Sequence, residues 1–208
     1  HNLAASEILC PRASWIEGGK LREDGPTEEV IAAYLATFSE AQRAGYDLEK
    51  VEGRGGDGSV RYTPVDFLDG EGNPTAVFRC GEPLRARFHF DAKERVKDPH
   101  FDMVIHSDMG TRIATISSTH TGLYIPTLEA GPGLVEVVID DQFLLANRYY
   151  LSLWISTRQQ WYDVLDHCIA IDVEESNAHD NQGRGMHPKW GLVYMKSRWQ
   201  HGPPVAVR

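Results

Sequence analysis

An alternating run of aromatic and polar residues near position 150 carries the side chains best suited to hold a ligand. Tyr150, Ser152 and Trp154 alternate with a second, apolar set: Tyr149, Leu151, Leu153 and Ile155. A period of two is typical of a β-strand, so one set faces a core and the other faces outward. An outward aromatic ring offers a flat apolar surface on which a sugar can stack. The alternative is that Trp154 packs under a loop or a partner chain.

Histidines and carboxylates are numerous enough to suggest a metal site or an acid–base pair. Four of them lie close together in the sequence: His100, Asp102, His106 and Asp108. On one strand face Asp102 and His106 would stand about 13 Å apart, too far to share an ion without a bulge. Asp163 and Asp166 would suit a glycosidase, but no feature places them across a cleft. Since no G-x-S-x-G elbow or Cys/His nucleophile signature occurs, we expect no catalytic residue and no metal site.

The composition argues against several classes of partner. The formal net charge is −9 at pH 7, which disfavours nucleic acid and anionic lipid as main partners. No apolar run reaches the roughly 18 residues that a membrane span needs, and the start of the chain lacks a signal-peptide pattern. The cysteines show no C-x-x-C spacing, so we expect reduced, mostly buried thiols in a cytosolic protein.

From Ser59 onward the sequence predicts strands separated by turns rich in glycine, aspartate and proline. The clearest alternation covers residues 84–91, where apolar residues alternate with charged and polar ones: Arg85, Arg87, His89 and Asp91. Further strands are predicted over residues 59–68, 101–107, 111–118, 134–139, 148–157 and 161–173. Roughly seven or eight short strands without helical periods between them predict an all-β fold, an antiparallel β-sandwich of the immunoglobulin or jelly-roll kind.

The sequence of residues 1–44 predicts a unit separate from the β-sandwich, with a strand at 13–17, a tight turn and a helix. Thr27 is a good N-cap for a helix that would run to about Arg43. The string from His1 to Tyr34 resembles the final segment of an ABC transporter ATP-binding domain, with His1-Asn2 at that family's switch histidine. The phosphate loop G-x-x-x-x-G-K-[ST] is absent. The resemblance therefore implies that ATP and Mg²⁺ bind only to the rest of a full-length protein, and that this chain alone needs no cofactor.

Residues 45–58 are rich in glycine and charge and contain no apolar period. We interpret them as a linker between the remnant of an ATP-binding domain and a domain over residues 59–200. A phosphate cradle would need a helix directly after the glycines, and a strand-like sequence follows instead.

The strand-rich part also resembles a known family. Its motifs occur in the order G-D-G-S-V-R-Y, F-x-x-G-E-P-L, F-D-M-V-I-H-S-D-M-G, L-L-A-N-R-Y-Y-L-S-L and G-L-V-Y-M-K-S-R-W. Over residues 58–199 they resemble the C-terminal carbohydrate-binding domain of Wzt, the ATP-binding subunit of O-antigen polysaccharide exporters. Asn147 replaces a family glycine in a turn, and asparagine also tolerates a left-handed backbone. The resemblance implies a cytoplasmic domain, held at the inner membrane by a membrane-spanning transporter subunit, that binds the end of a finished glycan.

Two outward faces of the expected sandwich could bind a sugar, which needs an aromatic surface and polar groups for its hydroxyls. An immunoglobulin-type order places the strands at 101–107, 111–118, 148–157 and 161–173 in one sheet. The outward residues of that sheet and of its hairpin end form the predicted carbohydrate-binding site: His106, Tyr150, Ser152, Trp154, Arg158 and Trp161. An arginine would suit an anionic sugar. The alternative face carries Arg85, Arg87 and His89.

The last apolar segment predicts contact with a second copy of the chain. Residues 177–189 form a long polar connection, and the segment around Leu192 is apolar on both faces. Such a strand must be covered on both sides, so we expect a homodimer made by exchange of the C-terminal strand, as the resemblance also implies. One alternative is that the strand closes its own sheet. Another is that the whole domain serves dimerisation or regulation without binding a glycan.

Overall fold

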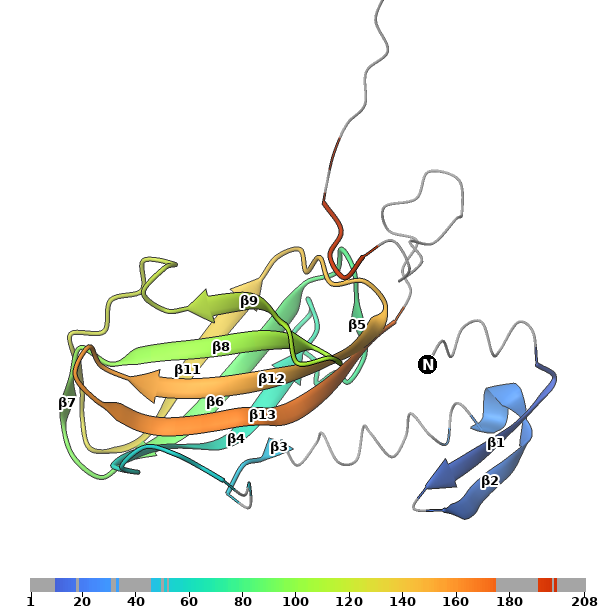
Figure 1. The fold of residues 1–208 in the computed structure, drawn as a ribbon, viewed down its shortest axis with the longest axis horizontal. Helices are drawn as coiled ribbons and strands as arrows, with labels where there is room; N and C mark the ends of the chain where they lie inside the picture. The colour runs from blue at the N-terminus through green and yellow to red at the C-terminus, as the bar shows by residue number, and fades with distance from the viewer. Residues whose placement is uncertain are drawn as a thin grey trace, which may run out of the picture.

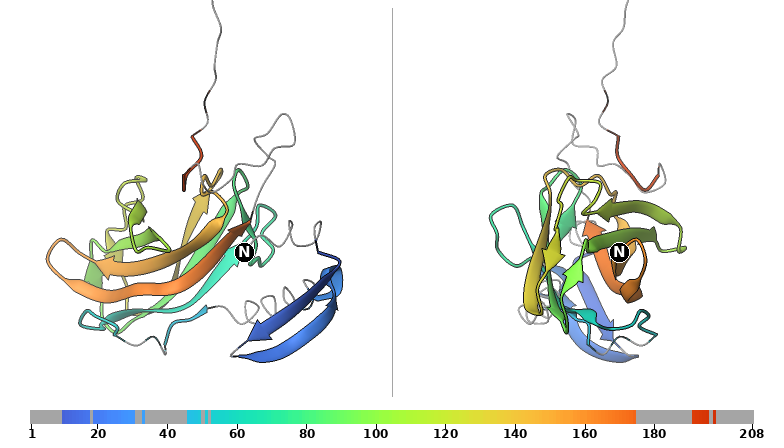
Figure 2. Two further views of the ribbon diagram at one scale, coloured as in Figure 1. Left: turned by 45° about the vertical axis from the view of Figure 1, so that its right-hand side comes forward. Right: turned by 90° about the vertical axis from the view of Figure 1, so that its left-hand side faces the viewer.

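The structure, a computed structural model, describes residues 10–17, 19–30, 33, 46–49, 51, 53–174, 191–195 and 197. Two β-sheets pack face to face as a sandwich, and a separate hairpin lies beside it near the N-terminus (Figure 1, Figure 2). The predicted all-β sandwich with a short N-terminal helical segment is confirmed.

One sheet has four strands in the order β11-β6-β4-β3, all antiparallel to their neighbours. Their bounds are Gly131–Ile139 for β11, Leu84–Ala92 for β6, Val60–Leu68 for β4 and Tyr46–Asp47 for β3. Strand β6 alternates between buried and more exposed residues along its whole length, as its sequence predicted. The alternation fixes which of its side chains enter the core.

The other sheet has five strands in the order β5-β13-β12-β8-β9. Their bounds are Phe78–Arg79 for β5, Trp161–Glu174 for β13, Asn147–Ser156 for β12, His100–Ser107 for β8 and Arg112–Ser117 for β9. The four longer strands are the ones predicted to share a sheet, and β12 and β13 form the predicted hairpin. Short β5 pairs parallel to the end of β13. A two-stranded ribbon joins β7, Val96–Lys97, to β10, Thr127–Leu128.

The core lies between the two sheets and is filled from both. The largest fully buried side chains include Tyr62 of β4 and a run on β12: Tyr149, Leu151, Leu153 and Ile155. Aromatic rings meet across the sheets, with ring centroids of Phe90 and Phe101 5.3 Å apart. Burial of each such large apolar side chain contributes roughly 1.5–3 kcal/mol, which holds the sheets together.

The N-terminal hairpin matches the predicted strand and turn. Strand β1, Arg12–Glu17, pairs antiparallel with β2, Lys20–Pro26. Strand β2 continues to Pro26, where a turn was expected, and residues 27–30 and 33 are helical. The hydroxyl of Thr27, the predicted N-cap, instead donates to the carbonyl of Cys10 at 2.5 Å. The rest of the predicted helix, to Arg43, lies outside the described residues.

The described residues of the glycine-rich stretch, 46–49, 51 and 53–58, lie against the sandwich, in a stretch that we interpreted as a linker. Strand β3 extends the four-stranded sheet, and Leu48 is buried in the core. Gly55 exchanges two backbone hydrogen bonds with Val164 of β13. The limits of the predicted units, 1–44, 45–58 and 59–200, stay a prediction.

The described part of the C-terminal segment lies beside the loop before β12. Leu145 donates its N–H to the carbonyl of Leu192, and Tyr194 donates to the carbonyl of Phe143. The predicted connection at 177–189 lies outside the described residues, so exchange of the C-terminal strand stays a prediction.

The cysteines are free where the structure describes them, and they differ in burial. Cys80 is buried, Cys168 is half-buried and Cys10 is exposed, so the expectation of buried thiols does not hold at Cys10. Burial raises the pKa of Cys168 to about 12, which keeps this thiol protonated. In the part of the chain that the structure describes, no helix is long and apolar enough to cross a membrane.

Candidate functional site

Strand β12 presents three of the predicted site residues on the outer side of the five-stranded sheet. Its inward residues are buried in the core, so the alternation turns Tyr150, Ser152 and Trp154 outward. Strands β8 and β13 flank β12 on either side, as Figure 1 shows. His106 of β8 lies directly opposite Tyr150. The four residues therefore share one face, as predicted.

Ser152 lies beneath two histidine rings at the centre of this face. Its Oγ is 3.0 Å from Nε2 of His106 and accepts a hydrogen bond from the backbone N–H of His167 at 2.9 Å. The two ring centroids are 4.4 Å apart, and the Tyr150 ring lies 6.2 Å from that of His167. Ser152 is fully buried, so it positions the histidines and is covered by them.

A β-bulge in β13 brings His167 over this centre. The register between β12 and β13 shifts between Leu151 and Leu153, so three residues of β13 lie opposite Ser152. His167 takes a left-handed conformation there, with a φ of 49°. A bulge re-aims side chains, and this one turns two successive residues, Asp166 and His167, outward.

His106 is held neutral at pH 7 by its surroundings. Burial, followed by the charge of nearby His167, lowers the pKa of His106 below its ordinary value of 6.5. Its Nδ1 atom is buried. A hydrogen bond with the backbone of Gly110 opposes these two effects and raises the pKa. A neutral ring both donates and accepts hydrogen bonds, as a sugar hydroxyl does.

Trp154, Trp161 and Arg112 form a second group on this face, here called the tryptophan corner. The two indole rings are nearly perpendicular, at 88°, with centroids 5.8 Å apart. The guanidinium carbon of Arg112 lies 5.2 Å from the Trp154 ring centroid, within cation–π range. Nε1 of Trp154 donates to Oδ1 of Asp166 at 3.1 Å. Trp161 remains 53% exposed, so its ring is open to a ligand.

Arg158 does not join the other five predicted residues. It is exposed on the turn between β12 and β13 and lines a hollow of about 590 Å³ at the end of the sandwich. The other residues of that hollow come from the start of β8 and from the loops between β7 and β10: Asp98, His100, Thr119, Gly122, Leu123 and Tyr124. The alternation of inward and outward side chains along β12 does not continue through a turn. The sequence therefore could not show which way Arg158 points.

The structure adds three residues to this face that the sequence analysis did not select: Arg112, Asp166 and His167. Asp166 and His167 depend on the bulge, which breaks the alternation from which faces were assigned. Arg112 follows a register shift between Ile105 and His106 of β8. The Asp108-Met109-Gly110 turn marks the start of β9, which is the one sequence signal for Arg112.

The alternative face, on the four-stranded sheet, is occupied by ion pairs. Nε of Arg87 lies 2.6 Å from Glu136, and Arg85 lies 3.9 Å from the same carboxylate. His89 lies 2.9 Å from Asp66. Arg87 and His89 are therefore paired with carboxylates of neighbouring strands, whereas Nε of Arg85 is buried without a hydrogen-bond partner among the described residues.

The suggested glycosidase pair is split between the two sides of β13. Asp163 is fully buried and bound by Arg54, whereas Asp166 is exposed on the outer face. Two carboxylates placed in this way cannot flank one glycosidic bond. Across the described residues, no three histidine, cysteine or carboxylate side chains are grouped to hold a metal ion.

Comparison with known proteins assigns the chain to a family. Residues 51–194 match the model of the Wzt C-terminal domain. The chain belongs to the Wzt C-terminal domain family. The match spans the sandwich and includes the glycine-rich stretch from residue 51, in agreement with its packing on β13.

Curated relatives of this Wzt-type chain are subunits of exporters. It is 28% identical over 172 residues to the O-antigen export system ATP-binding protein RfbB of Myxococcus xanthus, covering 76% of this chain and 39% of RfbB. It is 43% identical over 47 residues to the teichoic acids export ATP-binding protein TagH of Staphylococcus epidermidis, covering 21% of this chain and 18% of TagH. The chain thus spans well under half the length of either relative.

The fold is shared with a solved structure. The crystal structure of the C-terminal domain of wzt superposes with a TM-score of 0.61 at 14% sequence identity, covering 78% of this chain and 95% of that one. At this identity the likeness establishes the fold alone.

Proposed function

We propose that this chain is a non-catalytic carbohydrate-binding module that recognises the end of an O-antigen-type polysaccharide for export by an ABC transporter. The observation that carries the proposal is the tryptophan corner beside the stacked rings of His106 and His167. Trp161 offers an open apolar surface for the C–H face of a sugar. His167 and Arg112 offer polar groups to its hydroxyls or to an anionic substituent.

The wider setting follows from the family and from the names of the relatives. An export ATP-binding protein works with a membrane-spanning transporter subunit, which we propose as the partner of the full-length protein. The module would then be cytoplasmic and peripheral to the inner membrane. ATP and Mg²⁺ would bind to the ATP-binding part of the full-length protein, and the module itself would use no cofactor.

We also propose the homodimer with exchanged C-terminal strands. Val193 is 44% exposed and Met195 is 80% exposed in the single chain, so this segment leaves apolar surface for a second chain to cover. The same surface favours the alternative function, a dimerisation domain without glycan binding. Light scattering at micromolar concentration tests the exchange, and a monomer would exclude it.

Titration tests the proposed function directly. The probe is O-polysaccharide released by mild acid from the lipopolysaccharide of the bacterium that encodes the chain, followed by NMR of ¹⁵N-labelled protein. We expect saturable shifts at residues of the outer face of the five-stranded sheet, and none with dextran as a control polysaccharide. Shifts confined to the C-terminal segment, or no shifts, would favour the dimerisation function.

A further inference from the structure

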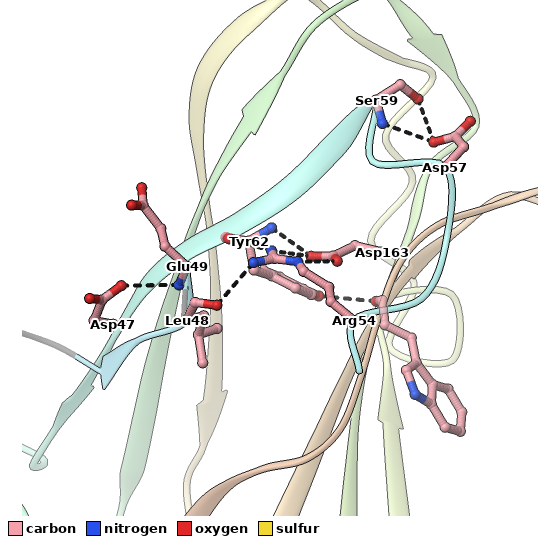
Figure 3. A network of polar contacts seen from close by, with 9 residues as sticks. Asp47, Leu48, Glu49, Arg54, Asp57, Ser59, Tyr62 and Asp163 are labelled. Carbon is pink, nitrogen blue, oxygen red and sulfur yellow. Dashed lines mark hydrogen bonds and ion pairs between the residues drawn. The ribbon is translucent and has the colours of Figure 1, made fainter. Parts of the chain in front are cut away.

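A buried ion pair joins the glycine-rich stretch to β13 (Figure 3). Nε and Nη2 of Arg54 each lie 2.6 Å from a carboxylate oxygen of Asp163, a residue 109 positions later in the chain. Both side chains are nine-tenths or more buried. Arg54 also donates to the backbone carbonyls of Leu48 and Tyr62. A buried pair is stable only when its remaining hydrogen bonds are satisfied, and this one meets that condition.

Tyr62 connects this ion pair to the tryptophan corner. Its backbone N–H donates to Oδ2 of Asp163 at 2.8 Å, and its hydroxyl donates to the backbone carbonyl of Trp154 at 3.0 Å. Tyr62 is itself buried, with its ring fixed by those of Phe88 and Phe101. A continuous set of hydrogen bonds therefore runs from Arg54 through Asp163 and Tyr62 to the backbone of Trp154.

Residues 53–58, here called the tether segment, also lie along the start of β13. Backbone N–H groups of Gly55, Asp57 and Gly58 donate to carbonyls of residues 164, 161 and 162 of β13. At Gly56, a Cβ atom would lie only 2.4 Å from the carbonyl oxygen of Tyr162. The glycines thus allow the tether segment to approach β13 beside Trp161, which explains a composition that looks like a flexible linker.

We propose that the tether segment positions the tryptophan corner, and that its docking on β13 is coupled to sugar binding there. The second part rests on the proposed function. Coupling between two sites is reciprocal, so a bound glycan strengthens the docking as much as docking strengthens glycan binding. The tether segment follows the part of the chain that resembles an ATP-binding domain.

Two glycine substitutions separate docking from backbone strain. Gly56 and Gly72 both have a φ of 88°, so alanine strains both equally. Only Gly56 faces β13, whereas nothing lies within 4 Å of a Cβ at Gly72. Gly56→Ala displaces the tether segment, and Gly72→Ala is the matched control. Both are compared with the wild type well below their melting temperatures, after labelling with 5-fluorotryptophan for ¹⁹F NMR.

We expect Gly56→Ala to shift the ¹⁹F signals of Trp154 and Trp161, and Gly72→Ala to leave them unchanged. Affinity for the O-polysaccharide should fall roughly fivefold or more in Gly56→Ala alone. A tether with only a structural role would lower the melting temperature without moving these signals or the affinity, and that result overturns the proposal. If Gly56→Ala does not fold, Arg54→Lys takes its place, because lysine keeps the charge but loses the bidentate contact. The ¹⁹F signals and the O-polysaccharide affinity are again the two readouts.

Hydrogen exchange tests the reciprocal direction in the unmutated chain. Saturation with the O-polysaccharide should slow exchange at the N–H groups of Gly55 and Gly58, and unchanged rates would overturn the coupling. If the wild type binds no O-polysaccharide, the proposed function fails and the coupling to sugar with it. The ¹⁹F comparison still decides whether the tether segment positions the corner.

Discussion

The outer faces of the two sheets use polar residues in opposite ways. On the four-stranded sheet, Glu136 lies directly opposite Arg87 across a strand pair, and the two side chains form an ion pair. On the five-stranded sheet, His106 lies opposite Tyr150, and Trp154 lies opposite Asp102. Cross-strand neighbours decide the outcome. Opposite charges across a strand pair form an ion pair, whereas an aromatic neighbour such as Tyr150 or Trp154 cannot.

Two faces with similar sequence patterns thus differ in their contacts. Both were candidates from alternation alone, and both carry arginine and histidine. On the outer face of the five-stranded sheet, the charge of Arg112 lies against an indole ring, whereas Arg87 on the four-stranded sheet lies against a carboxylate.

Removal of the Trp154 side chain should have the largest effect on O-polysaccharide affinity. Trp154→Ala is expected to weaken O-polysaccharide binding at least about 30-fold, near 2 kcal/mol, because it removes one wall of the tryptophan corner. The melting temperature should change little, since the ring is only half-buried. The exposed aromatic Tyr124, replaced by alanine, is the control. Equal affinity for Trp154→Ala and wild type, by calorimetry, would place the site elsewhere.

Two arginine substitutions compare the faces directly. Arg112→Ala should weaken O-polysaccharide binding by roughly 1 kcal/mol, about fivefold, because the guanidinium beside Trp154 is lost. Arg87→Ala, on the four-stranded sheet, should leave the affinity unchanged because Glu136 already holds that guanidinium. Calorimetry on both variants measures the contrast. A loss of affinity in Arg87→Ala alone would reverse our assignment of the faces.

The pH dependence of stability should reveal the buried histidine. The pKa of His106 is lower in the folded state than its ordinary value of 6.5, so above that pH both states are neutral there and its contribution is complete. As pH falls below 6.5, the unfolded state gains a proton first. Stability then declines by less than about 1.4 kcal/mol per pH unit until the folded pKa is reached.

His106→Gln should flatten that part of the profile, because glutamine keeps a hydrogen bond to Ser152 but does not titrate. Urea unfolding between pH 7.5 and pH 5 measures both profiles. A decline of the same slope in His106→Gln would assign the effect to other groups.

The smallest effect is expected from the ion pairs of the four-stranded sheet. Glu136→Gln removes the partner of Arg87 and Arg85, but these groups are partly exposed, so the loss in stability should stay below about 1 kcal/mol. It should shrink further in 1 M salt, where the Debye length is about 3 Å. Urea unfolding at low and high salt gives the measurement. A loss above 2 kcal/mol would mean that this face is more than a solvated surface.

Alternation along the strands was enough to predict the fold class and one shared face of the site. Buried and more exposed residues alternate along β6 as the sequence indicated, and five of the six predicted residues, all but Arg158, lie on one sheet face. A period of two is a local property, set by strand geometry, so it can be read without knowing the partner strand.

Only the tertiary structure decided the contacts between distant residues. The bulge that turns Asp166 and His167 outward depends on the pairing of β13 with β12. The partner of Asp163 is Arg54, from a stretch whose glycines suggested a flexible linker. Glycine permits both a flexible chain and a close approach of two backbones, and the sequence does not distinguish them. At Gly56 the structure shows a close approach of two backbones, because the carbonyl of Tyr162 leaves no room for a side chain.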